Sequence, residues 1–282
     1  MCINMKKYHG LGNDYLVLDP HKSEIDLNEK AIRLICNRNF GPGSDGILYG
    51  PIIEKGKIKV KIYNPDGSEA EKSGNGIRIF SRYLLDEGYV TGKRFTLSTL
   101  GGDVKVEFMD SKGFMIKVDM GKASFISKEI PTTGKSREVV NEEMNFNGEI
   151  FKVTCVNIGN PHCVIPMNNI SEEKAKALGP FVENSSNFPN RINMQLLKVI
   201  DRSNISIEIY ERGAGYTLAS GTSSSAAAAA AYRLGLVDEE VEVHSPGGKL
   251  HVRLDKEFNV QLTGQVESVG KFELSEEFIS KL

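Results

Sequence analysis

The fold is decided by the stretch Tyr210-Glu211-Arg212-Gly213-Ala214-Gly215-Tyr216-Thr217-Leu218-Ala219-Ser220-Gly221-Thr222. A second stretch, from Tyr63 to Asn75, lies 147 residues upstream and follows the same plan. In both, a tyrosine ends an apolar, strand-like run, a turn containing glycine follows, and a serine-glycine pair comes ten residues after the tyrosine. Helical patterns begin at both serines, Ser73 and Ser220. The chain therefore repeats a strand, turn and helix.

Other glycine turns repeat at the same offset. Gly12-Asn13 corresponds to Gly159-Asn160, and Gly101-Gly102 corresponds within one residue to Gly247-Gly248. Several correspondences in the same order indicate an internal duplication. We therefore expect two similar half-domains, with their two helix starts on opposite sides of one cleft. Such an arrangement would suit chemistry on two faces of one carbon atom.

Length and composition limit the possible functions. The chain has 282 residues, enough for two domains, of which 40% are hydrophobic and 26% charged. The net charge is −2 with both signs mixed, which argues against a nucleic-acid stripe or a patch for anionic membranes. No apolar run approaches the roughly 20 residues of a membrane span, and no secretory leader is visible. We expect a soluble protein with a small-molecule ligand, and neither nucleic acid nor membrane as a partner.

The four cysteines are Cys2, Cys36, Cys155 and Cys163. Their spacing is not that of metal ligands, and the last two lie within apolar runs. We expect free, mostly buried thiols, no metal site and a reducing compartment, hence the cytoplasm.

The segment 41–46, Gly-Pro-Gly-Ser-Asp-Gly, has the GxGxxG spacing of dinucleotide-binding loops. It follows a helical pattern instead of a strand, contains Pro42 and leads into a strand-like run from Ile47. We therefore predict a tight loop without a cofactor.

The element pattern predicts an α/β fold of the α+β kind. Residues 94–120 alternate apolar and polar side chains around a glycine turn, as antiparallel strands do. Six consecutive alanines, Ala226 to Ala231, suit a helix surrounded by sheet. We expect two pseudo-symmetric domains, each a curved, barrel-like, mostly antiparallel sheet around a central helix, with the active site in the cleft between them. The expected halves are 1–122, completed by 267–282, and 123–266.

The two repeated helix starts are candidate carboxylate sites, because helix N-termini offer unpaired N–H groups and a partial positive charge. They are Ser73-Gly74-Asn75 and Ser220-Gly221-Thr222. Serine is also a preferred N-cap residue, so each serine alone could merely cap its helix. The matched pair favours a shared ligand site.

Four asparagines lie in or beside the repeated turns and are candidate substrate-binding residues: Asn13, Asn64, Asn160 and Asn193. An asparagine amide can donate and accept hydrogen bonds, but asparagine also stabilises turns by itself.

Three further side chains could carry charge or protons. Glu211 and Arg212 end a strand, where they could hold an ammonium and a carboxylate or pair with each other. His162 lies in a repeated turn of the second half, and its repeat partner is Tyr15. Both positions therefore carry a polar aromatic residue.

The order of these motifs resembles that of diaminopimelate epimerase over nearly the whole chain. The motifs are His-Gly-Leu-Gly-Asn-Asp (9–14), Asn-Pro-Asp-Gly-Ser-Glu (64–69), Gly-Asn-Gly-Ile-Arg (74–78), Gly-Asn-Pro-His (159–162), Phe-Pro-Asn-Arg-Ile-Asn (188–193), Glu-Arg-Gly-Ala-Gly (211–215) and Ser-Pro-Gly-Gly (245–248). The resemblance implies a cofactor-independent amino-acid epimerase with two pseudo-symmetric domains and substrate between them. It also suggests a homodimer.

The resemblance also implies roles for individual residues. In that family a cysteine thiolate removes the α-proton, and a second cysteine thiol delivers a proton to the opposite face. Ser73 and Ser220 occupy these two positions here. The implied holders of the reacting carboxylate are the N–H groups of Gly74, Asn75, Gly221 and Thr222. Glu211 would hold the reacting amine, and His162 and Glu211 would be polar neighbours of the reactive side chains. The far amino-acid end of the substrate would be held by a second group of residues, the distal grip, which consists of Asn64, Asn160, Asn193 and Arg212.

The two serines depart from the family pattern at its chemical centre. A thiol has a pKa of about 8.5 that falls further at a helix N-terminus, whereas a serine hydroxyl has no comparably accessible anion. Two deliberate substitutions that trap an inactive complex would explain the serines, and so would a natural non-racemising relative. In either case we expect low or no activity from the Ser73/Ser220 form.

Tyr216 is a second departure, because the family usually has glutamate after Gly-Ala-Gly. This residue either faces the ligand or merely packs. Two alternatives to diaminopimelate epimerisation stay open: a racemase of another amino acid, for example histidine, and a non-catalytic amino-acid-binding protein.

Overall fold

The computed structural model describes residues 3–282, so Cys2 lies outside the described residues. The chain forms two compact units: unit 1 comprises Met1–Val118 and Gly264–Leu282, and unit 2 comprises Asp119–Thr263. The boundaries that we expected from the sequence fall three or four residues further along the chain.

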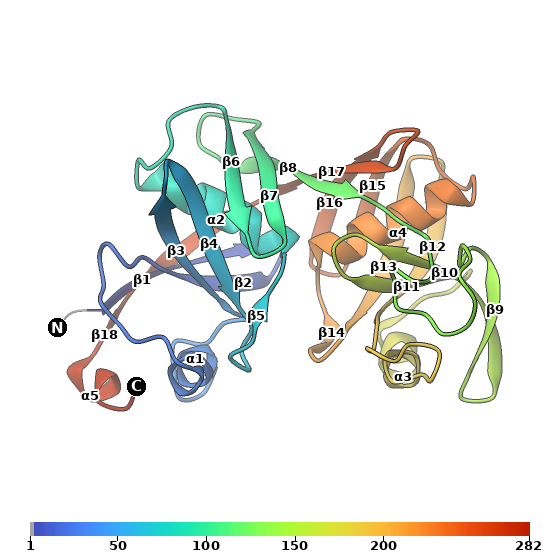
Figure 1. Ribbon diagram of the computed structural model, residues 1–282, viewed down its shortest axis with the longest axis horizontal. Helices are drawn as coiled ribbons and strands as arrows, with labels where there is room; N and C mark the ends of the chain where they lie inside the picture. Colours follow the sequence, from blue (N-terminus) through green and yellow to red (C-terminus); the bar gives the residue numbers. More distant parts are fainter. Residues whose placement is uncertain (1–2) are drawn as a thin grey trace. The chain divides into compact units, whose positions relative to one another are not determined.

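Unit 1 is a mostly antiparallel sheet with two long helices and a short one at its C-terminal end (Figure 1). Its elements are β1 (Ile3–Gly10), β2 (Asn13–Leu18), α1 (Glu29–Cys36), β3 (Ile47–Glu54), β4 (Lys57–Tyr63), β5 (Glu69–Ala70), α2 (Gly74–Asp86), β6 (Arg94–Thr99), β7 (Gly102–Phe108), β8 (Met115–Lys122), β18 (Glu267–Leu274) and α5 (Glu276–Ile279). The strands follow the order β18-β1-β2-β3-β4-β6-β7-β8, with β5 also paired to β4. Only β2–β3 and β4–β6 in this series are parallel.

Unit 2 repeats this plan. Its elements are β9 (Glu142–Phe146), β10 (Glu149–Asn157), β11 (Pro161–Pro166), α3 (Glu172–Glu183), β12 (Asn193–Asp201), β13 (Asn204–Glu211), β14 (Gly215–Thr217), α4 (Gly221–Arg233), β15 (Glu240–Ser245), β16 (Gly248–Leu254) and β17 (Asn259–Gln265). The strands follow the order β9-β10-β11-β12-β13-β15-β16-β17, with β14 also paired to β13. The parallel pairs β11–β12 and β13–β15 occupy the places of β2–β3 and β4–β6 in unit 1.

The registers repeat as well as the order. Leu16 is opposite Ile47 in the first parallel pair of unit 1, and Cys163 is opposite Met194 in that of unit 2, both shifted by 147 residues. The expected fold class is thereby confirmed, with one topology that is mostly antiparallel and occurs in each of the two units.

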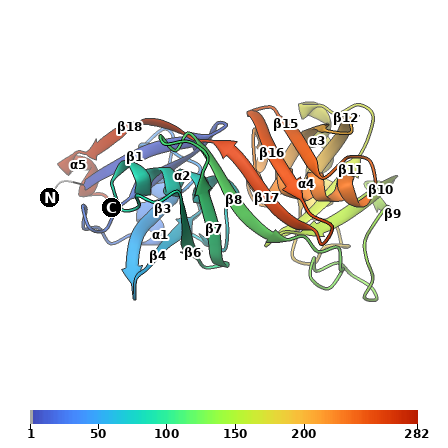
Figure 2. The same cartoon turned by 90° about the horizontal axis from the view of Figure 1, so that it is seen from above.

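The equivalent central helices α2 and α4 each span 13 residues. Helix α2 buries most of its length with Ile, Phe, Tyr and Leu side chains. In α4, residues 221–231 are all buried, and the alanine run 226–231 lets strands on several sides approach its backbone. Figure 1 shows α4, in orange, among the strands of unit 2, and Figure 2 shows it from above.

The outer helices α1 and α3 each cover one face of a sheet. Asn28 caps α1, and Ala31, Ile32, Ile35 and Cys36 form its buried stripe. This stripe packs on β1, β2 and β3 side chains, which include Met5, Leu16 and Ile47. Helix α3 covers the corresponding core of unit 2.

The GxGxxG segment is a loop between α1 and β3, as predicted. Its backbone folds back on the end of α1, where Gly43 N donates to Ile35 O at 3.0 Å and Ser44 N donates to Cys36 O at 3.1 Å. These N–H groups are therefore already paired within the protein.

The three described cysteines, Cys36, Cys155 and Cys163, are buried free thiols, as expected. Burial is the main cause that raises the pKa of the Cys36 thiol to about 11. Among residues 3–282, no helix is both long and apolar enough to cross a bilayer.

Candidate active site

The N-terminal end of α2 is organised by the Ser73 hydroxyl. Ser73 Oγ accepts a hydrogen bond from Gly76 N at 3.0 Å, so Ser73 is an N-cap, and the same oxygen lies 3.2 Å from the Tyr15 hydroxyl on β2. Glycine at position 76 keeps this end open, because a Cβ there would approach Ser73 Cβ to 3.2 Å. The capping role of Ser73 is confirmed, and the Tyr15 contact places a second hydroxyl at the same point.

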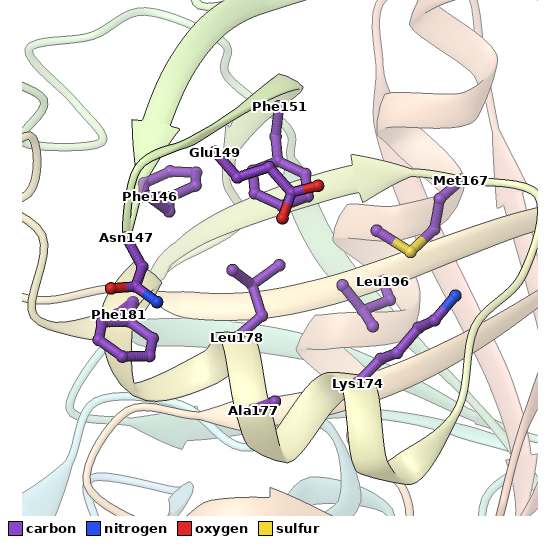
Figure 3. A pocket seen from close by; sticks show the side chains of 10 residues that line it. All are labelled: Phe146, Asn147, Glu149, Phe151, Met167, Lys174, Ala177, Leu178, Phe181 and Leu196. Carbon is purple, nitrogen blue, oxygen red and sulfur yellow. The ribbon is translucent and has the colours of Figure 1, made fainter.

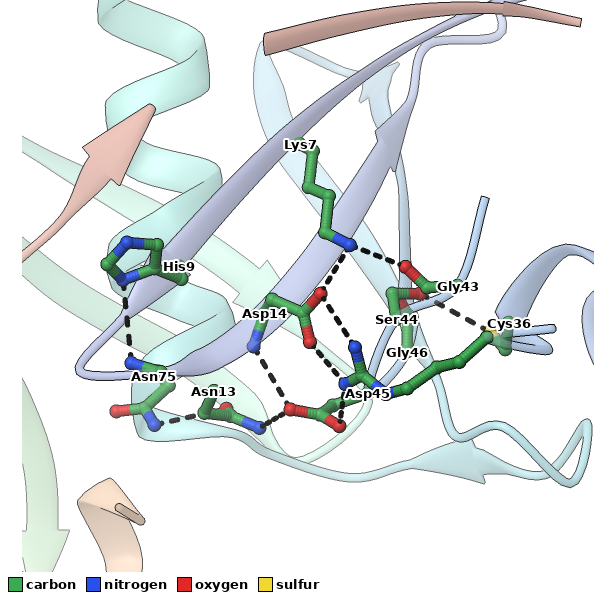
Figure 4. A network of polar contacts seen from close by, with 12 residues as sticks. Lys7, His9, Asn13, Asp14, Cys36, Gly43, Ser44, Asp45, Gly46 and Asn75 are labelled. Atoms are coloured by element: carbon green, nitrogen blue, oxygen red, sulfur yellow. Dashed lines mark hydrogen bonds and ion pairs between the residues drawn. The ribbon is translucent and has the colours of Figure 1, made fainter. Parts of the chain in front are cut away.

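Asn75 joins the helix end to the β1–β2 turn. Its side chain is buried, and its Nδ2 donates to Asn13 Oδ1 at 3.0 Å. Asn13 Nδ2 in turn donates to Asp45 Oδ2 at 3.0 Å, as Figure 4 shows. The structure therefore brings together Ser73, Gly74, Asn75 and Asn13 of the predicted site.

A charged network that we did not predict supports Asn13 (Figure 4). Arg38 Nη2 lies 2.6 Å from both Asp14 Oδ1 and Asp45 Oδ1, and Lys7 Nζ lies 2.7 Å from Asp14 Oδ2. Burial by itself would raise the pKa of Asp14, but the hydrogen bonds from Arg38 and Lys7 outweigh it and hold this pKa below its ordinary value. The two carboxylates and the guanidinium fix the loop that orients Asn13.

Asn64 lies at the end of β4, in a turn of its own. Its Nδ2 donates to Ser68 Oγ at 3.0 Å, and its backbone N donates to Ser68 O at 2.9 Å. These hydrogen bonds stay within the turn, so for Asn64 the structure shows the local role that asparagine commonly has.

The N-terminal end of α4 has the equivalent arrangement in unit 2. Ser220 is 6% exposed, and its Oγ accepts a hydrogen bond from Ser223 N at 3.4 Å and lies 3.4 Å from Thr222 Oγ1. Asn160 Nδ2 donates to Thr222 Oγ1, also at 3.4 Å. Asn160 and Thr222 are the repeat partners of Asn13 and Asn75, so one side-chain contact recurs in both units.

His162 is fully buried on β11, with its Nε2 2.7 Å from Asn160 Oδ1. Burial lowers the pKa of His162 to about 3, and the positive charge of Arg212 contributes in the same direction. The imidazole is therefore neutral at pH 7, so it orients Asn160 and cannot act as a cationic acid. We predicted His162 as a polar neighbour of a reactive side chain; this stays a prediction, and the structure places its Nε2 beside Asn160.

Asn193 and Arg212 are fixed next to each other by backbone contacts. Asn193, opposite His162 in the β11–β12 pair, donates from Nδ2 to Pro161 O at 2.8 Å and accepts at Oδ1 from Arg212 N at 2.9 Å. Arg212 Nη1 donates to Asn190 O at 3.1 Å. Glu211, half-buried, ends β13 opposite Gly215.

Glu183 is a buried acid that we did not predict as a site residue. Its Oε1 accepts from Arg191 Nη1 and from Gly213 N, both at 2.9 Å. It thereby ties the segment before β12 to the turn after Arg212, from a position 30 residues away from that turn.

Tyr216 packs against its own unit. Its hydroxyl donates to Glu208 Oε2 at 2.7 Å, Lys176 Nζ lies 5.2 Å from its ring centroid, and its ring covers the core beneath α3. Of the two roles that we considered for this residue, the packing role agrees with these contacts.

Tyr216→Glu is therefore expected to change substrate preference little. In a form made active by S73C and S220C, the ratio of kcat/KM for meso-diaminopimelate to that for histidine should shift by less than about threefold, or roughly 0.7 kcal/mol. Tyr216→Phe, which loses only the hydrogen bond to Glu208, is the matched control. A shift of more than tenfold with Tyr216→Glu alone would show that this position contacts the substrate.

A separate hollow of about 310 Å³ lies between α3 and the β9–β10 hairpin (Figure 3). Phe146, Phe151, Leu178 and Phe181 supply much of its apolar lining, and Lys174 reaches its rim. None of the predicted site residues lines it.

The fold described here is shared with racemases and epimerases. A probable proline racemase from Agrobacterium radiobacter K84 superimposes with a TM-score of 0.73 at 15% sequence identity, over 97% of this chain and 93% of that one. At this identity the likeness shows the fold alone.

Sequence comparison defines the family. A family model for diaminopimelate epimerase matches residues 5–126 and 154–269. Diaminopimelate epimerase 2 of Nostoc sp. is 50% identical over 275 residues, which cover 97% of this chain and 96% of the relative. Diaminopimelate epimerase of Caldanaerobacter subterraneus subsp. tengcongensis is 37% identical over 95% of this chain and 98% of the relative. The chain belongs to the diaminopimelate epimerase family and is thus an isomerase by descent.

Proposed function

We propose that this chain is built to interconvert LL- and meso-diaminopimelate without pyridoxal phosphate, in the supply of lysine and cell-wall precursors. The observation that carries the proposal is the pair of equivalent helix ends: Ser73 caps α2 and Ser220 caps α4, and an asparagine from the repeated turn contacts the second helical residue in both. The names of the relatives support the choice of substrate.

The proposed chemistry uses one group on each face of the substrate α-carbon. One of the side chains at positions 73 and 220 removes the α-proton, and the other delivers a proton to the opposite face. The first N–H groups of a helix have no carbonyl partner inside it, so those of Gly74, Asn75, Gly221 and Thr222 are suited to the reacting carboxylate. Glu211 would hold the reacting amine. The proposed distal grip consists of Asn64, Asn160, Asn193 and Arg212, with Asn13 orienting Asn75.

The serines make turnover slow in this proposal. Each hydroxyl accepts a hydrogen bond from its own helix, and its closest side-chain partner is another hydroxyl, that of Tyr15 for Ser73 and that of Thr222 for Ser220. Neither partner is a base able to generate an alkoxide. We therefore expect a chain that binds its amino acid and exchanges the α-proton poorly.

Arg212→Met tests the assignment of the substrate. The guanidinium is the positive charge of the proposed distal grip, so its loss should weaken binding of meso-diaminopimelate by about 2 to 5 kcal/mol, or roughly 30- to 5,000-fold in Kd. Isothermal titration calorimetry measures this directly and needs no turnover. A test on several amino acids would also reveal a preference for a different substrate.

Arg202→Met is the control, because Arg202 also belongs to unit 2 but is exposed and paired with Asp238. It should leave Kd unchanged. If the Arg212→Met and unaltered chains have the same Kd for meso-diaminopimelate, Arg212 does not bind the substrate. Tight binding in the unaltered chain with no exchange in any cysteine-restored form would favour a non-catalytic amino-acid-binding protein.

A further inference from the structure

Arg78 is a buried positive charge beneath the first turn of α2. The side chain is 0% exposed, yet Arg78 Nη1 donates to Gly74 O at 3.1 Å and Nη2 donates to Asn75 Oδ1 at 2.6 Å. Nε is buried and has no hydrogen-bond partner. A Cβ at residue 10 would come within 3.2 Å of Nη2, so Gly10 leaves the space that the guanidinium fills.

The Arg78 guanidinium has no acidic side chain beside it as a counter-ion among the described residues of unit 1. Among the described residues of unit 1, no carboxylate forms an ion pair with Arg78, and both of its acceptors are neutral amide oxygens. Burial alone lowers the pKa of Arg78, to about 10, so the guanidinium stays charged at pH 7. A buried charge without a counter-ion costs considerable stability, and such groups in proteins are normally paired.

Unit 2 lacks the corresponding charge. The repeat partner of Arg78 is Ser225, whose hydroxyl donates to Gly221 O at 2.8 Å. The acceptor carbonyl is the equivalent one, since Gly221 is the repeat partner of Gly74. The two helix ends therefore share a capping serine and a hydrogen-bonded first turn, but only the α2 end has a full positive charge below it.

We infer that Arg78 makes the N-terminal end of α2 the stronger anion-holding end of the pair. Its charge adds to the partial positive charge of the helix terminus and acts through buried protein, where Coulomb interactions are screened less than in water. The inference rests on the proposed function: Arg78 would favour a substrate carboxylate at Gly74 and Asn75 and a deprotonated group at position 73. The two faces of the reaction would consequently be unequal, with proton removal easier at position 73 than at position 220.

Thiol titration tests this inference without turnover. S73C and S220C are prepared separately, and the rate of alkylation by iodoacetamide is followed against pH. The chain has four other thiols: Cys36, Cys155 and Cys163, which are buried, and Cys2. Peptide mass spectrometry therefore identifies which thiol has been modified. In the S73C background, R78M and R78Q should raise the half-reaction pH by about one unit or more, which means about tenfold less thiolate at neutral pH. R78K, which keeps the charge, should restore most of the effect.

S225A in the S220C background is the matched control, because it removes the equivalent hydrogen bond without changing charge. The half-reaction pH of the S220C thiol should be the same with and without S225A. If the three Arg78 variants titrate alike, Arg78 is merely structural and the inference is wrong.

If R78M and R78Q do not fold, Y15F/S73C is compared with S220C. Y15F removes the other group at Ser73, so the S73C thiol should still titrate at the lower pH, and equal values would overturn the inference. The two ideas can also fail separately. If the titration of the S73C thiol depends on the charge at position 78 but the S73C/S220C form shows no α-proton exchange, the proposed function is wrong and the charge effect of Arg78 is still supported.

Discussion

The double substitution S73C/S220C is expected to raise α-proton exchange of meso-diaminopimelate into deuterated water by about three orders of magnitude or more. A thiol at each helix end supplies an accessible anion where the hydroxyl supplies none, and a positioned acid or base typically contributes about 10²- to 10⁴-fold. Proton NMR of the α-position measures the exchange. Each single substitution should allow exchange from one face with little epimerisation.

Ser171 offers a matched control for the thiol itself. It caps α3 as Ser73 and Ser220 cap their helices, and its side chain accepts a hydrogen bond from Lys174 N, but it belongs to neither repeated helix end. S171C should therefore leave exchange at the level of the unaltered chain. If S73C/S220C exchanges no faster than S171C on any amino acid tested, the two-base proposal fails.

Gly179→Ala should unfold unit 2 at markedly lower denaturant concentration. Helix α3 crosses the Tyr210 ring so closely that a Cβ at residue 179 would lie 2.2 Å from Tyr210 Cγ and 2.4 Å from Cδ2. Alanine favours a helix over glycine by about 1 kcal/mol, but here the ring or the helix must move. We expect the free energy of unfolding to fall by about 3 kcal/mol or more, as measured by urea titration.

Gly270→Ala is the control, because a Cβ there meets no atom within 4 Å and the backbone of β18 at this residue does not have a positive φ. Its effect should stay within about 0.5 kcal/mol. An unfolding free energy for Gly179→Ala equal to that of the control would mean that α3 does not press on Tyr210.

The repeated parts of the fold and site could be predicted from sequence because each is a local pattern. Ser73 and Ser220 directly precede helical segments, and both cap those helices. The contact between Asn13 and Asn75 joins two motifs that the repeat had already paired with Asn160 and Thr222.

The supporting residues could not be predicted in the same way. Asp45 reaches Asn13 only because the loop after α1 folds back beside the β1–β2 turn, and Glu183 reaches Gly213 across 30 residues of chain. Such contacts depend on the tertiary path, which no short spacing reveals. Tyr216 shows the same limit, since its motif left open whether the side chain faces the ligand or packs, and only the tertiary structure shows its contacts with Glu208 and with the core beneath α3.

The alanine-rich helix α4 also determines how unit 2 can open. Residues 221–231 bury every face, so no stripe of α4 can turn to water while the surrounding strands stay in place. Its amide hydrogens should exchange with solvent only when the sheet around them separates, whereas amides of α1, which has one exposed face, can exchange through smaller openings. We therefore expect the end of α4 that carries Ser220 to open only together with the sheet around it.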